Sequence, residues 1–247
     1  MQKKQLALAA LFTALLLLFA VPLRVPFRAP FPCAAAECAE RAEREDLVAL
    51  PEGEPAGKRR IYLTFDDGPS TVVTGRVLDT LHREGVKATF FIVSDRVPGR
   101  EEVLRRIVRE GHTVGVHSAT HDYSAIYASD EALLSDVAAC AECIRRVTGV
   151  TARCYRFPGG GGARREQQTA LLEGLGYRVV RWNAVCGDEE VRGADAETLV
   201  GMSIRTAGKR NTVVLLLHDS APHKATAEAL PAIIAHFRAR GYAFCAY

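Results

Sequence analysis

The sequence lacks the charge imbalance and the surface patterns of a nucleic-acid-binding protein. Its 32 Lys and Arg against 29 Asp and Glu leave a formal net charge of only +3 among 247 residues. No stretch interleaves aromatic with basic side chains in the way that suits a nucleic-acid surface. We therefore expect no nucleic-acid partner. No internal repeat is visible, and the composition, 48% hydrophobic and 25% charged, suits one globular domain with an additional segment.

One glycine-based motif and one cysteine-based motif are also incomplete. The glycine run Gly159–Gly162 is not followed by Lys and Ser or Thr and lacks the spacing of a dinucleotide-binding loop, so it does not predict a phosphate cradle. Cys140 and Cys143 fall one turn apart on an expected helix, but no second Cys-x-x-Cys accompanies them, which leaves a structural zinc site poorly supported. The seven cysteines are an odd number, so at least one thiol is left over in an oxidised protein. If the protein is outside a cell, two disulfides are possible, Cys33 with Cys38 and Cys154 with Cys186. The alternative is that each cysteine is a small buried hydrophobic residue.

The N-terminal residues are typical of an export segment rather than of a folded domain. Lys3 and Lys4 precede an uncharged apolar run from Leu6 to about Val21, as a basic region precedes a hydrophobic one. The run is long for a signal peptide and slightly short for a membrane-spanning helix. The small residues at 34–36 lie far downstream, which weakens the case for cleavage. We interpret residues 1–24 as a signal peptide or membrane anchor, with the anchor favoured. The body of the protein is then exported and held on the outer face of the cytoplasmic membrane, or secreted if the segment is cleaved.

The rest of the chain divides into a linker and a folded domain. Residues 25–58 are predicted to be a linker, because they are rich in Ala, Glu and Arg and carry Pro or Gly at 51, 53, 55 and 57. From Arg59 onward, apolar strand-like runs alternate with helical patterns that repeatedly stop at glycine. The expected strands are 61–65, 88–93, 113–116, 153–157, 178–182, 212–217 and 243–246, and the expected helices are 72–84, 101–110, 130–148, 164–175, 195–206 and 225–240. This alternation predicts an α/β fold with parallel strands. About seven repeats favour a (β/α) barrel, complete or incomplete, over an open sheet.

Two adjacent carboxylates, Asp66 and Asp67, follow the apolar run 61–65 and come directly before a Gly-Pro breaker. A strand that ends there presents both acids at its carboxyl end, where open α/β and barrel proteins keep their chemistry. Successive strand side chains point to opposite faces, so the two acids can take different roles, one holding a metal and the other handling a proton. The alternative is a plain turn, which Asp, Gly and Pro each favour.

His117 and His121 come directly after the expected strand 113–116. Residues four apart meet on one face if the segment turns helically, and this is a spacing with which histidines chelate a metal. No Glu follows His117, so the segment is not the His-Glu-x-x-His motif of zinc proteases. Two histidines and one Asp would give three protein ligands and leave a position open for water, as catalytic metal sites do. The alternative is a pair of loop histidines with local hydrogen bonds.

Two further segments combine polar residues with expected strand ends. Arg156 leads through Phe157 and Pro158 into the glycine run, whose backbone amides can approach a ligand closely. The alternative for this run is a flexible loop. His218 and Asp219 end the apolar run 212–217, either at the functional end of a barrel or with the histidine as a simple strand cap.

Together these segments resemble the polysaccharide deacetylase family, also described as NodB-homology or carbohydrate esterase 4. The motifs that carry the resemblance are Thr-Phe-Asp-Asp-Gly, His-Ser-x-x-His, Arg-Phe-Pro-Gly-Gly and Leu-Leu-His-Asp, in the family's order and spacing. Segments 88–91 and 110–112 also look like the family. The resemblance covers residues 59–247, which we interpret as the catalytic domain. It implies a distorted (β/α) barrel that removes acetyl groups from N-acetylated sugars.

The resemblance implies a metal and two proton-transfer residues. Asp67, His117 and His121 would bind a divalent cation, with Zn²⁺ the first expectation and Co²⁺, Mn²⁺ or Ni²⁺ as alternatives. Asp66 would be the general base, and His218 would be the general acid that protonates the leaving sugar amine.

Four more residues take supporting roles by the same resemblance. Arg156 would orient the base, and the backbone amide of Gly159 would be an oxyanion donor. Trp182 and Leu216 would line the acetyl pocket.

One region departs from the family pattern. Many members carry an Asp just before the tryptophan or three residues after it, and the latter Asp tethers the catalytic histidine. Arg181 and Val185 occupy those places here. Asp188 and Asp219 are the two candidates to substitute in tethering His218, and the sequence leaves the choice open.

Combined with the N-terminal segment, the resemblance favours an exported, monomeric, metal-dependent deacetylase of cell-wall glycan, with peptidoglycan ahead of chitin or xylan. One alternative is a non-catalytic glycan-binding relative, supported only by the altered region around Trp182. Another is an esterase or amidohydrolase that acts on a small acylated molecule.

Overall fold

The structure is a computed structural model that describes residues 59–160 and 165–247. The predicted export segment 1–24 and linker 25–58 lie outside the described residues. No helix within the described ranges is long and apolar enough to cross a membrane. The strands are β1 Arg60–Gly68, β2 Thr89–Val93, β3 Thr113–Ser118, β4 Cys154–Tyr155, β5 Arg178–Val179, β6 Ala184–Val185, β7 Thr212–His218 and β8 Ala243–Cys245.

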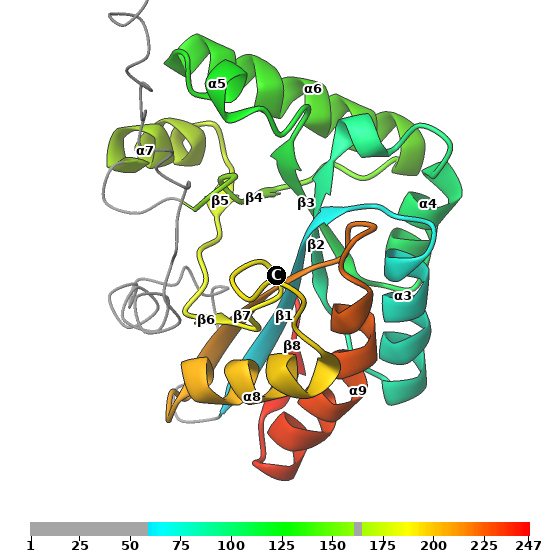
Figure 1. Cartoon of the computed structure of the whole chain (residues 1–247). Helices are drawn as coiled ribbons and strands as arrows, with labels where there is room; N and C mark the ends of the chain where they lie inside the picture. Colours follow the sequence, from blue (N-terminus) through cyan, green and yellow to red (C-terminus); the bar gives the residue numbers. More distant parts are fainter. Residues whose placement is uncertain (1–58, 161–164) are drawn as a thin grey trace, which may run out of the picture. The chain divides into compact units, whose positions relative to one another are not determined.

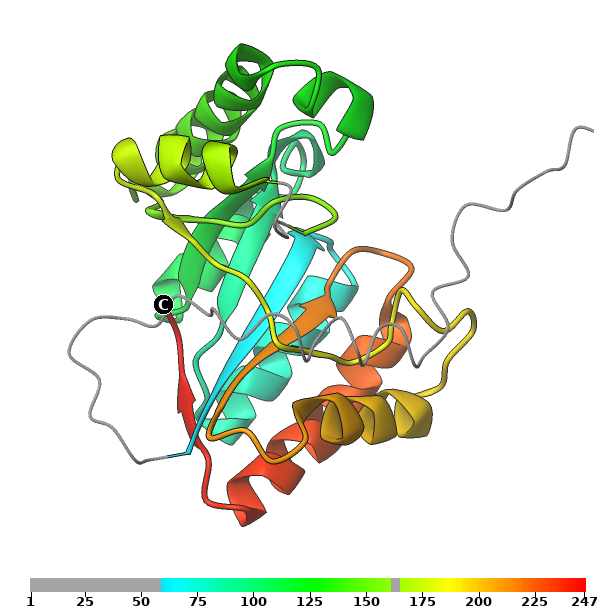
Figure 2. The same ribbon diagram turned by 90° about the vertical axis from the view of Figure 1, so that its left-hand side faces the viewer.

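These strands form one parallel sheet that curls into an incomplete barrel (Figure 1). The hydrogen-bonded order is β5-β4-β3-β2-β1-β7-β6, so β5 and β6 lie at opposite edges although only residues 180–183 connect them. A flat sheet would separate these edges by roughly 29 Å, at about 4.8 Å per strand, whereas five extended residue steps reach only about 18 Å. The sheet must therefore curl until its edges approach. Figure 2 shows the connection passing across the sheet.

The first strand is the centre of the sheet and has three partners. It pairs with β7 along Arg60–Asp66 on one side. On the other side it pairs with β8 through Arg60–Tyr62 and with β2 from Thr64 onward. The final strand therefore fills the edge that the short β2 leaves open, and all nine residues of β1 are buried.

Helices connect the strands and cover the convex face of the sheet (Figure 1). They are α3 Val73–Glu84, α4 Glu101–Arg109, α5 Tyr123–Ile126, α6 Asp130–Thr148, α7 Glu166–Gly174, α8 Ala196–Ala207 and α9 Lys224–Ala239, with a short 3₁₀ helix η1 at Ser94–Arg96. The longest, α6, begins where the Ser129 side chain accepts a hydrogen bond from the amide of Ala132 and ends at left-handed Gly149. Local capping signals therefore fix both of its ends.

Apolar side chains pack on both faces of the curled sheet. The larger cluster lies between the convex face and the helices, and it includes Phe65, Phe90 and Leu217. A smaller cluster fills the concave interior around Tyr62 and Phe91. Because Tyr62 comes four residues before Asp66 on β1, this inner cluster closes the barrel below the strand ends that carry the polar residues.

The structure confirms the predicted α/β barrel of parallel strands, which has the incomplete form of the two left open, and each predicted element has an observed counterpart. Helix α5, η1 and the two-residue strand β6 were not predicted, because such short elements have too few residues to show a period. The predicted strands 153–157 and 178–182 shrink to the two-residue strands β4 and β5, since the chain leaves the sheet early.

The cysteines of the described chain act as buried or half-buried thiols. The open pairing of Cys154 with Cys186 is wrong, since both are free; Cys154 belongs to the inner cluster and Cys186 to the outer one. Cys140 donates to the Ile92 carbonyl oxygen at 3.1 Å, and Cys143 one turn later is also free. The pairing of Cys33 with Cys38 lies outside the described residues.

Candidate active site

The carboxyl ends of β1, β3 and β7 bring together four buried polar side chains. Asp66 and Asp67 end β1, His117 lies near the end of β3, and His218 ends β7. Asp66 pairs in register with His218 on the neighbouring strand. Each of the four is at most 6% exposed. Burial of this many ionisable groups is costly unless they are paired, so their contacts define what the site can do.

The two adjacent aspartates face the same site rather than opposite faces of the sheet. Asp67 has a left-handed backbone with φ 74°, and the pairing of β1 with β2 shifts register between Asp66 and Gly68. His117 Nε2 lies 3.8 Å from Asp66 Oδ2 and 3.5 Å from Asp67 Oδ1. The prediction of alternating faces was therefore wrong in its geometry, because the left-handed residue interrupts the pleat.

The ring of His117 is held in one orientation by a backbone contact. Its Nδ1 lies 2.8 Å from the carbonyl oxygen of Arg156, which can only accept, so Nδ1 carries the proton and Nε2 keeps its lone pair. Burial lowers the pKa of His117 to about 3, which keeps the ring neutral. A neutral imidazole with a free Nε2 that faces a carboxylate is suited to bind a metal.

His121 reaches the same carboxylate through a turn, not a helix. Its backbone is left-handed with φ 62°, and its amide donates to the Ser118 hydroxyl at 2.8 Å. Asp136 of α6 accepts hydrogen bonds from that hydroxyl and from the amide of Ala119, at 3.1 and 3.0 Å. The helical alignment considered for the two histidines is therefore wrong, although the turn does bring His121 Nε2 to 3.1 Å from Asp67 Oδ1.

Asp67, His117 and His121 have the spacing and the unsatisfied oxygen that a metal site requires. Their ligand atoms lie within 4.8 Å of one another. Ligands about 2.1 Å from a tetrahedral ion are roughly 3.4 Å apart, and the distances from Asp67 Oδ1 to the two histidines, 3.5 and 3.1 Å, bracket that value. Among the described residues, this buried oxygen has no hydrogen-bond donor. The residues present therefore fit a divalent cation.

The second aspartate, Asp66, is paired with a buried arginine. Arg156, 1% exposed, donates from Nη1 to Asp66 Oδ1 at 2.9 Å and to the Thr64 hydroxyl at 2.7 Å. Its guanidinium stacks on Phe91, 4.3 Å from the ring centroid. Burial raises the pKa of Asp66, although the positive charge of Arg156 acts against this. Arg156 therefore contacts the carboxylate that it was predicted to orient, and that role stays a prediction.

His218 is tethered by Asp188, which answers the choice that the sequence left open. His218 Nδ1 and the His218 amide donate to the two oxygens of Asp188, each at 2.8 Å, and Thr226 donates to the same carboxylate at 2.7 Å. Burial alone would lower the pKa of His218, but the Asp188 carboxylate outweighs it and raises the pKa to about 10. The ring is therefore a cation at neutral pH with an Nε2–H to give.

Asp219, the other candidate tether, is hydrogen-bonded to Ser70 and Thr74. Its Oδ2 accepts from Thr74 at 2.6 Å, and its backbone oxygen accepts from Ser70 at 2.8 Å. Burial raises the pKa of Asp219 to about 7. It also sits so close to Gly68 that a Cβ there would lie 2.5 Å from Oδ2. Asp219 therefore joins the loop after β1 to the end of β7.

The remaining predicted site residues surround this centre. Leu216 is 6% exposed and lies two residues before His218, on the same face of β7. Trp182 packs on the inner cluster with its ring 5.5 Å from the Arg156 guanidinium. Gly159 has φ 71°, and a Cβ there would lie 3.3 Å from the Tyr123 hydroxyl. Both the left-handed backbone and this close contact favour glycine.

Sequence reasoning missed two supporting residues, Asp136 and Tyr123. Asp136 holds the turn that carries His121, but it sits within the regular helix α6 and gives no motif signal. Tyr123 follows His121 by two residues, and its ring lies tilted against the histidine ring, 5.3 Å between centroids. Segment 121–124 resembles the family, but that resemblance gave Tyr123 no role in the site.

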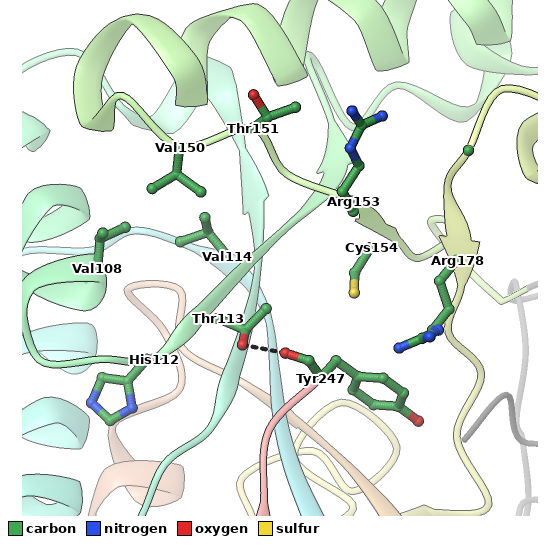
Figure 3. Close-up of a pocket in the computed structure, with 11 residues that line it drawn as sticks. Val108, His112, Thr113, Val114, Val150, Thr151, Arg153, Cys154, Arg178 and Tyr247 are labelled. Atoms are coloured by element: carbon green, nitrogen blue, oxygen red, sulfur yellow. Dashed lines mark hydrogen bonds between the residues drawn. The ribbon is translucent and has the colours of Figure 1, made fainter. Parts of the chain in front are cut away.

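A separate pocket lies at the other end of the strands (Figure 3). It has a volume of about 430 Å³ and is lined by the first residues of β3, β4 and β5, which are Thr113, Cys154 and Arg178, together with Tyr247. Thr113 donates to the Tyr247 carbonyl oxygen at 2.5 Å across it. No residue of the predicted site lines this pocket, so it does not belong to the centre at the carboxyl ends.

Comparison with known proteins identifies the family. The model of the polysaccharide deacetylase family matches residues 53–180. The chain belongs to the polysaccharide deacetylase family. Its members are hydrolases that act on the amide bonds of acetylated sugars, and the resemblance read from the motifs is thereby confirmed.

Several relatives are similar over most of this chain. The putative polysaccharide deacetylase YheN of Bacillus subtilis is 32% identical over 194 residues, 76% of this chain and 67% of that protein. The peptidoglycan-N-acetylglucosamine deacetylase PgdA of Listeria monocytogenes is 32% identical over 198 residues, 80% of this chain but only 40% of that protein. The chain therefore corresponds to less than half of the Listeria protein.

Solved structures share the fold. The catalytic domain of a peptidoglycan N-acetylglucosamine deacetylase from Eubacterium rectale superposes with a TM-score of 0.72 and 32% identity, covering 81% of this chain and 93% of that one. A carbohydrate esterase 4 enzyme from Streptococcus mutans gives a TM-score of 0.71 and 29% identity, covering 77% and 86%.

Proposed function

We propose that this protein hydrolyses the N-acetyl group of N-acetylated amino sugars in a cell-wall polysaccharide, peptidoglycan above all, and releases acetate. The observation that carries the proposal is the pairing of a buried carboxylate, Asp66, with a buried histidine, His218, across two adjacent strand ends. The group Asp67, His117 and His121 lies directly beside this pair. Amide hydrolysis needs both a base for water and an acid for the amine, and the pair can supply them.

Asp67, His117 and His121 would hold the divalent cation of this enzyme. Two imidazoles and one carboxylate suit Zn²⁺, and three protein ligands leave a position open. When bound, the cation would supply Lewis-acid activation of the acetamide carbonyl and of water. The hydrogen bond from His117 Nδ1 to the Arg156 carbonyl would orient this ligand.

Asp66 would act as the general base. Arg156 holds its Oδ1, which leaves Oδ2 on the side of His117 Nε2, 3.8 Å away. Oδ2 would take a proton from the attacking water as the oxygen bonds to the carbonyl carbon. The raised pKa of Asp66 favours this, because a more basic carboxylate accepts a proton more readily.

His218 would complete the reaction as general acid. As the bond from carbon to nitrogen breaks, Nε2–H would give its proton to the nitrogen, and the sugar leaves as an amine. The Asp188 carboxylate on Nδ1 keeps the ring protonated and oriented. The Gly159 amide would donate to the developing oxyanion, while Trp182 and Leu216 would enclose the acetyl methyl group.

Peptidoglycan is the favoured polymer because relatives from several bacteria are named as peptidoglycan deacetylases. The apolar segment at 6–21 supports export, and thus a position beside the cell wall on the outer face of the cytoplasmic membrane. We propose that the protein acts there as a monomer. Removal of acetyl groups would turn neutral amides of the glycan into amines that carry positive charge.

The test is acetate release by the full chain from purified peptidoglycan, chitooligosaccharide and acetylated xylan, with chelator and after Zn²⁺ is restored. The proposal predicts zinc-dependent release that is fastest from peptidoglycan. Faster release from another polymer would reassign the substrate. If the protein binds glycan but releases acetate from none of the polymers, it is a glycan-binding relative and not an enzyme.

A further inference from the structure

A second group of metal-ligating side chains lies on the other side of the candidate general acid. It consists of Glu189, His218 and His223, whose ligand atoms all lie within 4.8 Å of one another. His218 ends β7, His223 directly precedes α9, and Glu189 lies in the turn after β6. Three separate parts of the chain therefore converge on one point.

Both imidazole rings are oriented so that Nε2 is the atom left for a ligand. His218 Nδ1 lies 2.8 Å from Asp188 Oδ1, and His223 Nδ1 lies 2.9 Å from the Ser220 hydroxyl. Histidines that ligate metals usually have their second nitrogen fixed in this way, by a carboxylate or another polar group. The rings are nearly stacked, with centroids 5.2 Å apart and planes at 30°, and both Nε2 atoms lie within 4 Å of the Glu189 carboxylate.

The carboxylate of Glu189 lies between the two nitrogens without bonding to either. Its Oε2 is 3.8 Å from His218 Nε2 and its Oε1 is 3.9 Å from His223 Nε2, both beyond hydrogen-bond length. A tetrahedral ion needs these separations to be roughly 3.4 Å, so the ligands must close by about half an ångström. Glu189 is 53% exposed and can make that adjustment by rotation of its side chain.

We propose that a second Zn²⁺ binds to His218 Nε2, His223 Nε2 and Glu189 and inhibits the enzyme. The site is distinct from Asp67, His117 and His121, and its occupancy replaces the proton on His218 Nε2 by the metal. The inhibitory effect rests on the proposed role of His218, whereas binding of the ion does not. Since the ion must displace that proton, the second Zn²⁺ binds more weakly than the first.

The test measures zinc binding and activity separately, with His223→Ala and Glu189→Gln as variants. Equilibrium dialysis of the metal-free full chain against increasing Zn²⁺ should show two ions per wild-type chain and one per variant chain. Wild-type acetate release should rise with the first ion and then fall, by about 10²–10⁴-fold at saturation of the second, which is the contribution of a general acid. Both variants should keep their full activity in the same range of Zn²⁺.

Three outcomes would overturn the proposal: one ion per wild-type chain, two ions per chain in both variants, or unchanged zinc inhibition in the variants. A matched variant, His121→Ala, keeps the second group and should lose the tighter ion only. If no form of the protein releases acetate, the proposed function fails, but the ion count of wild type against His223→Ala still decides whether the second site exists.

Discussion

The replacement Asp188→Asn tests how the chain keeps its candidate general acid protonated. Asp188 is buried and its two oxygens accept from His218 Nδ1, the His218 amide and Thr226. The asparagine has the same shape and lacks the charge. Without that charge, burial is opposed only by the weaker effects of the Glu189 and Asp66 carboxylates, so the pKa of His218, about 10 in the wild type, should fall.

The size of the effect follows from the fraction of His218 that stays protonated. At the ordinary imidazole pKa of about 6.5, about a tenth of the molecules carry an imidazolium ion at about pH 7.5, whereas nearly all do in the wild type. We therefore expect kcat/KM of Asp188→Asn to fall by up to about tenfold at that pH and to recover as the pH is lowered.

The assay is the pH profile of kcat/KM, with the pKa of His218 measured in parallel by NMR titration. Glu189→Gln is the control: that carboxylate also faces His218, but it is half exposed and solvent screens it, so the profile should shift little. A wild-type profile and an unchanged His218 pKa in Asp188→Asn would refute the reasoning.

Three other replacements give independent predictions. Asp219 has a pKa of about 7 in the folded protein against an ordinary value of 3.8, so the unfolded chain ionises first and the wild type loses stability from about pH 4 to pH 7. Asp219→Asn should remove this loss, which is read from urea midpoints at the two pH values. Gly115→Ala should lower the free energy of unfolding by about 1–3 kcal/mol, because its Cβ would lie 2.6 Å from the Phe91 ring. His121→Ala should abolish the rise in Tm at the low Zn²⁺ concentrations that fill only the first, tighter site; for a site at 100 times its Kd that rise corresponds to about 2.7 kcal/mol.

Each of these has a control or a contrary result. Gly201→Ala, in α8 with nothing within 4 Å of its Cβ, should raise stability by about 0.5–1 kcal/mol; equal losses in both alanine variants would contradict the packing argument. Parallel stability curves for wild type and Asp219→Asn would show that Asp219 is not the group responsible. A rise in Tm that persists in His121→Ala at those low Zn²⁺ concentrations would place the first ion elsewhere.

The sequence predicted the location of the centre well because parallel strands bring their carboxyl ends to one edge. Asp66, His117 and His218 each end or nearly end an apolar run, and that alone places them together once the strands alternate with helices. The strand β6 escaped prediction because two residues carry no period. The curl of the sheet depends on the short connection between its edges, and that connection becomes visible only with the strand order.

The details of the site depended on local backbone conformation and on long-range contacts. Asp67 has a left-handed backbone, which no pattern of alternation reveals, and this brings both acids to one side. The choice between Asp188 and Asp219 required the three-dimensional path of the turn after β6. Asp219 is next to His218 in the sequence, whereas Asp188 reaches the histidine only in the folded chain. The oxyanion role of Gly159 stays a prediction.

The most direct test of the central claim compares wild type with Asp66→Asn at equal zinc content, one ion per chain, on peptidoglycan. The variant keeps the shape of the side chain and the three residues proposed as ligands, and lacks only the basic carboxylate. We expect the zinc content to be unchanged and acetate release to fall by about 10²–10⁴-fold. Acetate release at the wild-type rate by a zinc-loaded Asp66→Asn variant would show that Asp66 is not the general base.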